Sequence, residues 1–428
     1  MRLSARALRT RSLVHVEETG VTDTSIDVPV LRALFLHRPS LRVLPQLQEL
    51  VWRDHRLDSL PYLHLFLSSD LTRLEVRYPE DRDIGQTTFN ALSTSCPNIK
   101  YLKLLQFPLP VLSRMLILER PGIDTGFSQL ESLAVNERLP EDVLSYLSTL
   151  ASLKHLEYST DEEFPQFNTT HPFPSLCDFK VTLWLDFDPV QNFFEAVQLP
   201  NLTTLTIVIY AIMSRDQTLH LYNSISKFKT LTKLSIDMFP DEETDPDVDF
   251  AASIASLLTL RRLHTLSITH EDIRLGDDMI AQLAKNLPDL RVLRLVSLRL
   301  SAQITLTGLR KVATLFPQLE QLTAEIDFGT ISTPGSPPAR SFSPTNSRLR
   351  RLCVGYSIIH DTDRVAAALS AWFPNLQDIV EPRGLEDGQR TKWKAVRELI
   401  DRSRAAAQVR VDSRRMGSKV CLEHFRSP

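Results

Sequence analysis

One short phrase recurs along this chain and constrains its fold more than any other feature. It consists of an apolar residue, two variable residues, a leucine-like residue, one variable residue and a further apolar one, as in LRVLRL at 290–295. Segments 202–207, 231–236 and 263–268 repeat it closely. Because one such repeat cannot bury its apolar face alone, the repetition predicts a stack of similar units.

The phrase also predicts a short strand. Alternate residues of a strand point to opposite faces, so its leucines face the interior and the residues between them face outward. Fourteen phrases follow one another at an average spacing of about 26.5 residues, which lies within the range of leucine-rich repeats. They begin at Leu31, Leu47, Leu71, Ile99, Leu130, Leu153, Leu176, Leu202, Leu231, Leu263, Leu290, Leu319, Leu349 and Leu376.

Amphipathic helices are expected between the strands. Segments 279–287 and 309–316 place apolar residues at the 3.6-residue helical spacing, the first of them after Asp277, a candidate helix cap. Proline then precedes the next phrase, as in LPDL at 287–290, because it stops a helix and favours an extended exit. The sequence therefore predicts an α/β leucine-rich-repeat solenoid, a horseshoe. Its β/α layout resembles the leucine-rich repeats of the ribonuclease-inhibitor-like class. Its parallel β-sheet would line the concave face and its helices the convex face.

The bulk composition argues against several classes of protein. Of the 428 residues, 43% are hydrophobic and 24% charged, and the formal net charge is −3. No overall charge therefore draws the chain to nucleic acid or to anionic membrane. No apolar run reaches the ~18 residues of a membrane span. Four separated cysteines without metal-ligand pairing favour a reducing compartment, cytoplasmic or nuclear.

The pattern divides the chain into three parts. Residues 1–25 are interpreted as an N-terminal cap or degenerate first repeat, with an irregular strand at 12–16. The alternative is a transit peptide, because the segment is rich in arginine. Residues 26–382 form the irregular solenoid, with a disordered Ser/Pro-rich loop expected at 329–347. Residues 383–428 form a basic helical tail. We interpret it as a cap over the last repeat, the alternative being contact with acidic lipid or RNA.

Few residues indicate chemistry. The alternating aspartates of 245–249 lack the Gly and distal Glu of a calcium loop, which favours a solvated loop. Cys421 and His424 supply only two of the four ligands of a structural zinc site. Ser336 and Ser343 precede prolines and are either kinase sites or chance occurrences. Phosphate-loop, HExxH and GxSxG motifs are absent, so we expect a non-enzymatic protein without catalytic residues, metal or cofactor.

The outward strand positions are the candidate binding surface. Their charges are of mixed sign, which argues for a protein partner recognised by charge complementarity and against nucleic acid. Arg73, Arg77 and Tyr101 are the foremost candidates, because Arg and Tyr are enriched at hot spots; the alternative is that these are ordinary solvated residues. The predicted partner-binding set is Arg53, Arg73, Glu75, Arg77, Tyr101, Lys103, Lys180 and Arg294. Further outward polar residues are Glu49, His155, Glu157, Asp178, Lys233, Asp237, Glu325 and Arg351.

Irregular repeats with such Leu-Pro-x-Leu and Phe-Pro-x-Leu junctions resemble the leucine-rich-repeat part of fungal F-box proteins, over roughly residues 31–380. Segment 8–16, LRTRSLVHV, is similar to the stretch that often follows an F-box. The resemblance implies the substrate-recognition part of an SCF-type ubiquitin ligase receptor, whose F-box recruits the adaptor. No F-box-like helical segment precedes the repeats, so we expect a truncated receptor or an F-box-less repeat protein. The alternative is a leucine-rich-repeat scaffold or regulator with no ubiquitin role.

Overall fold

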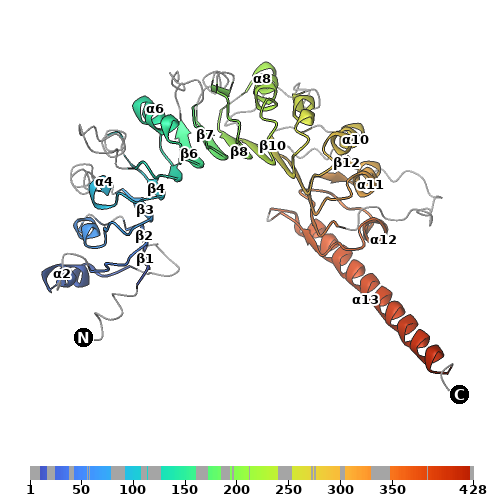
Figure 1. Ribbon diagram of the computed structural model, residues 1–428. Coiled ribbons are helices and arrows are strands. Elements are labelled where there is room, and N and C mark those ends of the chain that lie inside the picture. The colour runs from blue at the N-terminus through green and yellow to red at the C-terminus, as the bar shows by residue number, and fades with distance from the viewer. Residues whose placement is uncertain are drawn as a thin grey trace. The chain divides into compact units, whose positions relative to one another are not determined.

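The chain forms two compact units, Met1–Met213 and Ser214–Pro428, each a stack of β/α repeats (Figure 1). In each unit the helices lie on one side of a parallel sheet, which confirms the α/β leucine-rich-repeat fold. The structure is a computed structural model, and for 407–424 it describes the backbone alone. The described residues are 10–16, 25–37, 43–54, 56, 58–78, 92–107, 113, 127–160, 172–184, 193–194, 197–211, 213–239, 253–270, 273, 276–298, 304–328, 348–382 and 384–424.

The first unit contains a sheet whose strands follow one another in chain order, each parallel to the next. The strands are β1 (Ser12–His15), β2 (Glu49–Trp52), β3 (Arg73–Arg77), β4 (Tyr101–Leu105), β5 (Ser132–Val135), β6 (His155–Thr160), β7 (Asp178–Leu183) and β8 (Thr204–Ile209). The helical elements of this unit are α2 (Val28–His37), η1 (Leu60–Leu65), α4 (Leu92–Ser95) and α6 (Glu141–Thr149).

The second unit repeats this plan. Its strands β9 (Lys233–Met238), β10 (Thr265–His270), β11 (Val292–Ser297), β13 (Gln321–Thr323), β15 (Arg351–Cys353) and β16 (Asp378–Val380) pair in that order. Strands β12 (Ile304–Thr305) and β14 (Ile326–Asp327) form a separate two-stranded sheet. The helical elements are α8 (Arg215–Ile225), η2 (Ala255–Thr259), α10 (Asp277–Asn286), α11 (Leu306–Leu315), α12 (Thr362–Trp372) and α13 (Asp387–His424).

The apolar positions of the phrase form the core. Leu263, Leu266 and Ile268 are each 0% exposed, and in the sheet Leu266 lies beside Leu234 of β9 and Leu293 of β11. Each repeat therefore buries its leucines against those of its neighbours, as the repetition predicts. Helices α10 and α11 end one residue before their C-caps, Leu287 and Phe316, and a proline follows each cap.

The phrase at Leu31 is not a strand, and this prediction was wrong. Residues Val28–His37 form α2, and of its side chains Leu31 is buried while Leu36 is exposed. Residues three apart lie on the same face of a helix, and the strand phrase also places two apolar residues three positions apart. The spacing of the leucines alone therefore did not distinguish a helix from a strand. The first strand is instead β1, as expected for segment 12–16, and Leu13 pairs with Leu50 of β2.

A carboxylate joins two consecutive helices of the second unit. Asp277 is not the cap of α10, as the sequence predicted; Gly276 holds that position. The Asp277 carboxylate instead accepts hydrogen bonds from the hydroxyl (2.6 Å) and backbone N–H (3.1 Å) of Thr305, the N-cap of α11. A Cβ at Gly308 would lie 2.2 Å from Asp277 Oδ1, so this close approach requires glycine.

The start of α13 packs over the last repeat. Trp393 is fully buried, donates to the Ser357 carbonyl (3.1 Å) and contacts Phe328 edge to face. Arg397 donates to the Ile379 carbonyl at the end of the sheet. A polar helix over the terminal repeat would cover the end of a solenoid, and the capping role of the tail stays a prediction.

Several expectations fall on residues outside the described ranges. The predicted loop at 329–347, with Ser336 and Ser343, and the acidic stretch 245–249 lie there. Cys421 and His424 belong to α13, in the part where only the backbone is described. No helix in the described part of the chain combines the length and hydropathy needed to cross a bilayer.

We predict that Leu293→Asp abolishes the cooperative unfolding transition of the second unit. The leucine is 0% exposed, its truncation alone would cost about 2–5 kcal/mol, and an unpaired buried carboxylate adds a further desolvation penalty. A far-UV circular dichroism melt measures the effect.

The matched control is Arg294→Asp, which introduces the same charge at the next, exposed position of β11. The free energy of unfolding of this variant should stay within about 0.5 kcal/mol of the wild-type value. A Leu293→Asp melt that overlays the wild-type curve would contradict the assignment of this leucine to the core.

Candidate interaction surface

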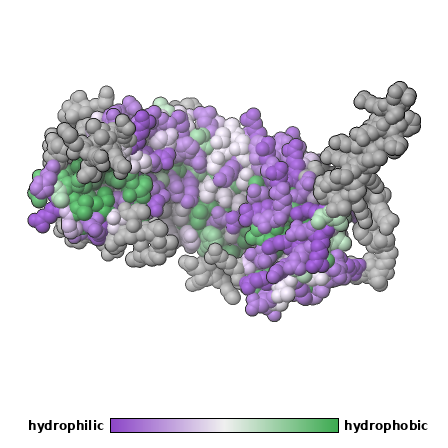
Figure 2. All heavy atoms as spheres, turned by 90° about the horizontal axis from the view of Figure 1, so that it is seen from below, coloured by the Kyte–Doolittle hydropathy of each residue, from purple (hydrophilic) through white to green (hydrophobic). Residues whose placement is uncertain are grey.

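The outward face of β2, β3 and β4 gathers most of the predicted partner-binding residues. The parallel register aligns Glu49, Arg73 and Tyr101 in one row across the three strands. The next row contains Glu75 beside Lys103. Figure 2, a view from the strand side, shows hydrophilic residues interspersed with hydrophobic ones. We call the outward side chains of β2–β4 and Arg53, which directly follows β2, the charged ladder.

Glu75 is the centre of the charged ladder. Its Oε1 lies 2.7 Å from Arg53 Nε and 3.5 Å from Lys103 Nζ, so one carboxylate pairs with cations from both neighbouring repeats. The Glu75 side chain is 15% exposed, whereas that of Lys103 is 46% exposed. The acid is thus held within the sheet while the lysine remains largely in solvent.

Arg73 lies between an acid and an aromatic ring. Its Nη1 is 3.8 Å from Glu49 Oε1, and its Cζ lies over the Tyr101 ring at 4.8 Å from the centroid. A guanidinium at this distance from a ring is within range of a cation–π interaction. Both side chains remain exposed, Arg73 by 55% and Tyr101 by 37%, so the pair presents an oriented cation and an aromatic face together.

The remaining predicted residues are less closely grouped. Arg77 belongs to the charged ladder and its Nε donates to Gln106 Oε1 at 2.8 Å. Lys180 lies on β7, where its Nζ pairs with Glu157 Oε1 at 2.6 Å. Arg294 is exposed on β11 in the second unit and has no ion-pair partner among the described residues. The structure therefore joins six of the eight: Arg53, Arg73, Glu75, Arg77, Tyr101 and Lys103.

The charged ladder carries more positive than negative charge. It contains four basic side chains, Arg53, Arg73, Arg77 and Lys103, and two carboxylates, Glu49 and Glu75. Exposed ion pairs of this kind contribute about 0–1 kcal/mol to stability. The cations are consequently available to a partner at little cost to the fold.

A stacked pair of an exposed tryptophan and a half-buried tyrosine was missed by the sequence analysis. The rings of Trp184 and Tyr210 stack at 4.4 Å between centroids, with 10° between their planes, just beyond the ends of β7 and β8. Trp184 is 52% exposed. Each residue stands eight positions after the first leucine of its phrase, Leu176 and Leu202, and this shared offset is the signal that could have found them.

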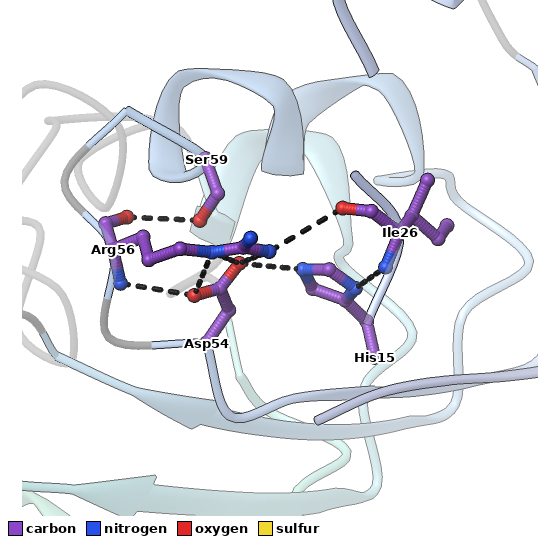
Figure 3. Close-up of polar contacts among 5 residues, drawn as sticks. All are labelled: His15, Ile26, Asp54, Arg56 and Ser59. Atoms are coloured by element: carbon purple, nitrogen blue, oxygen red, sulfur yellow. Dashed lines mark hydrogen bonds and ion pairs between the residues drawn. The ribbon is translucent and has the colours of Figure 1, made fainter. Parts of the chain in front are cut away.

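A buried ionic cluster lies at the N-terminal end of the first unit (Figure 3). His15 Nε2 is 2.8 Å from Asp54 Oδ2, and Arg56 Nη2 is 2.7 Å from the same oxygen. The His15 and Asp54 side chains are both 0% exposed. His15 Nδ1 accepts a hydrogen bond from the Ile26 backbone N–H at 2.8 Å, so Nε2 carries the proton and donates to Asp54.

This histidine–aspartate pair has a structural role. The ring nitrogen that a general base would use is occupied by a backbone amide, and the His15 ring packs 4.1 Å from that of Trp52. Burial raises the pKa of the Asp54 carboxyl, but hydrogen bonds from His15 and Arg56 outweigh it and hold that pKa well below its ordinary value. Among the described residues, no group of three or more His, Cys, Asp or Glu could hold a metal ion.

We predict that Asp54→Asn destabilises the first unit at pH 7 by about 3 kcal/mol, because Arg56 loses its buried counter-charge. The wild-type carboxyl has a lower pKa folded than unfolded. Its contribution is therefore complete above the unfolded value, about 3.8, and declines as the pH falls below it. Hydrogen exchange of the β1 amides, measured by mass spectrometry, reports the loss.

The control is Asp58→Asn, which removes a nearby but exposed carboxylate and should leave exchange unchanged. The difference in hydrogen exchange of the β1 amides between wild type and Asp54→Asn should decrease below about pH 4. An equal difference in exchange at pH 3 and pH 7 would mean that the loss of stability comes from the changed side-chain shape and not from the removal of its charge.

No protein-family model matches this chain, and no curated protein matches it. Among solved structures, a chain from the crystal structure of the Rad7 and Elc1 complex in yeast aligns with it at a TM-score of 0.43 and 13% identity. The alignment covers 85% of this chain and 86% of that chain. A likeness of this degree adds no argument about partners or activity.

Proposed function

We propose that this chain is a non-enzymatic interaction module that binds a protein partner through the charged ladder. The observation that carries the proposal is the ladder's geometry: three of its four cations, Arg53, Arg73 and Lys103, share two carboxylates across neighbouring strands, beside the exposed Tyr101. Surfaces of this kind recognise partners by complementary charge. The excess of basic groups favours an acidic segment on the partner.

Pre-organisation supports Arg73 and Tyr101 as the centre of this surface. The Tyr101 ring holds the Arg73 guanidinium in place, so less side-chain freedom is lost when a partner binds. Arg and Tyr are also the residue types that dominate hot spots. The Trp184–Tyr210 stack offers an aromatic contact further along the same sheet.

A more specific form of the proposal follows from the sequence resemblance alone. In it, the repeats are the substrate-recognition part of an F-box receptor of an SCF-type ubiquitin ligase, acting in the cytoplasm or nucleus. The acidic partner would then be the substrate, and an F-box outside this chain would contact the adaptor. The alternative is a leucine-rich-repeat scaffold or regulator with no ubiquitin role, for which the charged ladder would serve equally well.

We predict that Tyr101→Ala and Arg73→Glu each lower the affinity for the partner at least about tenfold, the equivalent of 1.4 kcal/mol. Affinity purification of the tagged chain from its native cells identifies the partner. Titration of the purified pair then measures the dissociation constant. Both side chains are exposed, so the variants should fold normally.

Arg261→Glu is the matched control, because it reverses an exposed charge away from the strands, in the turn before β10. Unchanged affinity in Tyr101→Ala and Arg73→Glu would reject the charged ladder as the binding surface. Co-purification of the ligase adaptor and cullin would support the receptor form of the proposal. A stable partner without them would support the scaffold.

A further inference from the structure

A largely apolar hollow in the second unit is lined by two acidic residues, Glu325 and Glu381. The hollow measures about 190 Å³ and spans the ends of β11, β13, β15 and β16. Its walls include Leu295, Val296, Ala324, Val380 and Pro382, and the Glu325 side chain also lines it. Glu381 is paired with Arg397 at 3.3 Å, so Glu325 is the lining acid without an ion-pair partner among the described residues. A largely apolar site with a few convergent polar groups is the usual form of a pocket that fixes a ligand's orientation.

Glu325 was expected to be a solvated outward residue, and this expectation was wrong. The residue is 9% exposed because the turn after β15 covers it. Gly355 in that turn has φ +53°, and a Cβ there would lie 2.7 Å from Glu325 Cγ. Glycine thus leaves the space that the glutamate occupies. The neighbouring Tyr356 backbone N–H donates to the Glu325 carboxylate.

The hollow supplies Glu325 with no counter-charge. None of the residues that line it is basic. The nearby cations have other partners: Arg351 Nε lies 3.6 Å from Asp378, and Arg397 Nη2 lies 3.3 Å from Glu381 at the rim. Burial raises the pKa of Glu325, and the Tyr356 amide opposes this only in part. A carboxylate so placed gains more from an incoming cation than an exposed one does.

We propose that this hollow receives a lysine side chain of a protein partner, whose ammonium pairs with Glu325 while its methylenes pack against the apolar walls. The inference rests on the proposed function in one respect, namely that the lysine belongs to a protein partner. Lysine fits better than arginine because the Tyr356 amide already occupies part of the carboxylate, whereas a guanidinium engages both oxygens. The compact ammonium of lysine on its aliphatic stem matches a single acid without a counter-charge beside apolar walls.

Cys353 provides a probe because its half-buried side chain also lines the hollow. In thiol–disulfide exchange with cystamine, its thiolate forms a mixed disulfide that carries an ammonium and releases cysteamine. Bis(2-hydroxyethyl) disulfide gives the neutral equivalent of similar size. At equal thiol-to-disulfide ratios, peptide mass mapping measures how much of each adduct forms.

We expect the cationic adduct to exceed the neutral one at Cys353 by at least about fivefold, equivalent to about 1 kcal/mol. The reference is the same ratio at Cys177, which is half-buried outside the hollow. Glu325→Gln should reduce the Cys353 ratio to the Cys177 value. Asp378→Asn, which removes an exposed carboxylate on the neighbouring strand, should preserve the preference. An equal ratio at the two cysteines, or an unchanged ratio in Glu325→Gln, would overturn the proposal.

A second measurement needs no variant and stands if Glu325→Gln does not fold. N-acetyl-lysine methylamide should slow the alkylation of wild-type Cys353 by iodoacetamide, and the norleucine analogue at the same concentration should not. Equal protection by both compounds would show an apolar site without a lysine preference and would overturn the proposal. These probes do not touch the charged ladder, so their outcome is independent of the partner titration.

Discussion

The structure depends on the constant parallel register between consecutive repeats. Leu234, Leu266 and Leu293 lie side by side on neighbouring strands and are each 0% exposed, since a single repeat buries too little apolar area to be stable alone. The same register forces the residues between the leucines into outward rows. Glu75 meets both Arg53 and Lys103 because the core has already fixed the strand positions. The outward residues can therefore vary with the partner while the core stays the same.

In the part of the chain that the structure describes, β1 and β16 each pair with a strand on one side only, and polar groups near both strands are satisfied by hydrogen bonds. At the first strand, His15 occupies a position where its partner strand has Trp52, and it is satisfied by Asp54 and the Ile26 amide. At the last repeat, Trp393 enters from α13 and donates to a backbone carbonyl. Leaving such groups unpaired would be costly. The geometry that satisfies them also fixes how the terminal elements pack.

The period-two phrase predicted the strands and most of the charged ladder, because strand alternation is a local property. The phrase did not predict burial that depends on contacts between residues distant in sequence. The burial of Glu325 depends on a positive φ at Gly355 in the next repeat, which the local alternation does not show. The prediction of a strand at Leu31 was wrong for a local reason, because the spacing of apolar residues there suits a helix as well as a strand. Trp184 lies beyond the phrase, so the alternation within the phrase does not reach it, and only its offset from Leu176 relates it to Tyr210.

The two proposed surfaces differ in the way that charge acts on them. The charged ladder is exposed to solvent, so physiological salt screens its attraction beyond about 8 Å. Its cations then serve mainly to orient and accelerate the encounter with an acidic surface. Glu325 is nearly buried in an apolar hollow, where screening is weaker and a paired cation leaves slowly. The ladder would therefore act on the association rate of its partner, and the hollow on the residence time of the lysine that it binds.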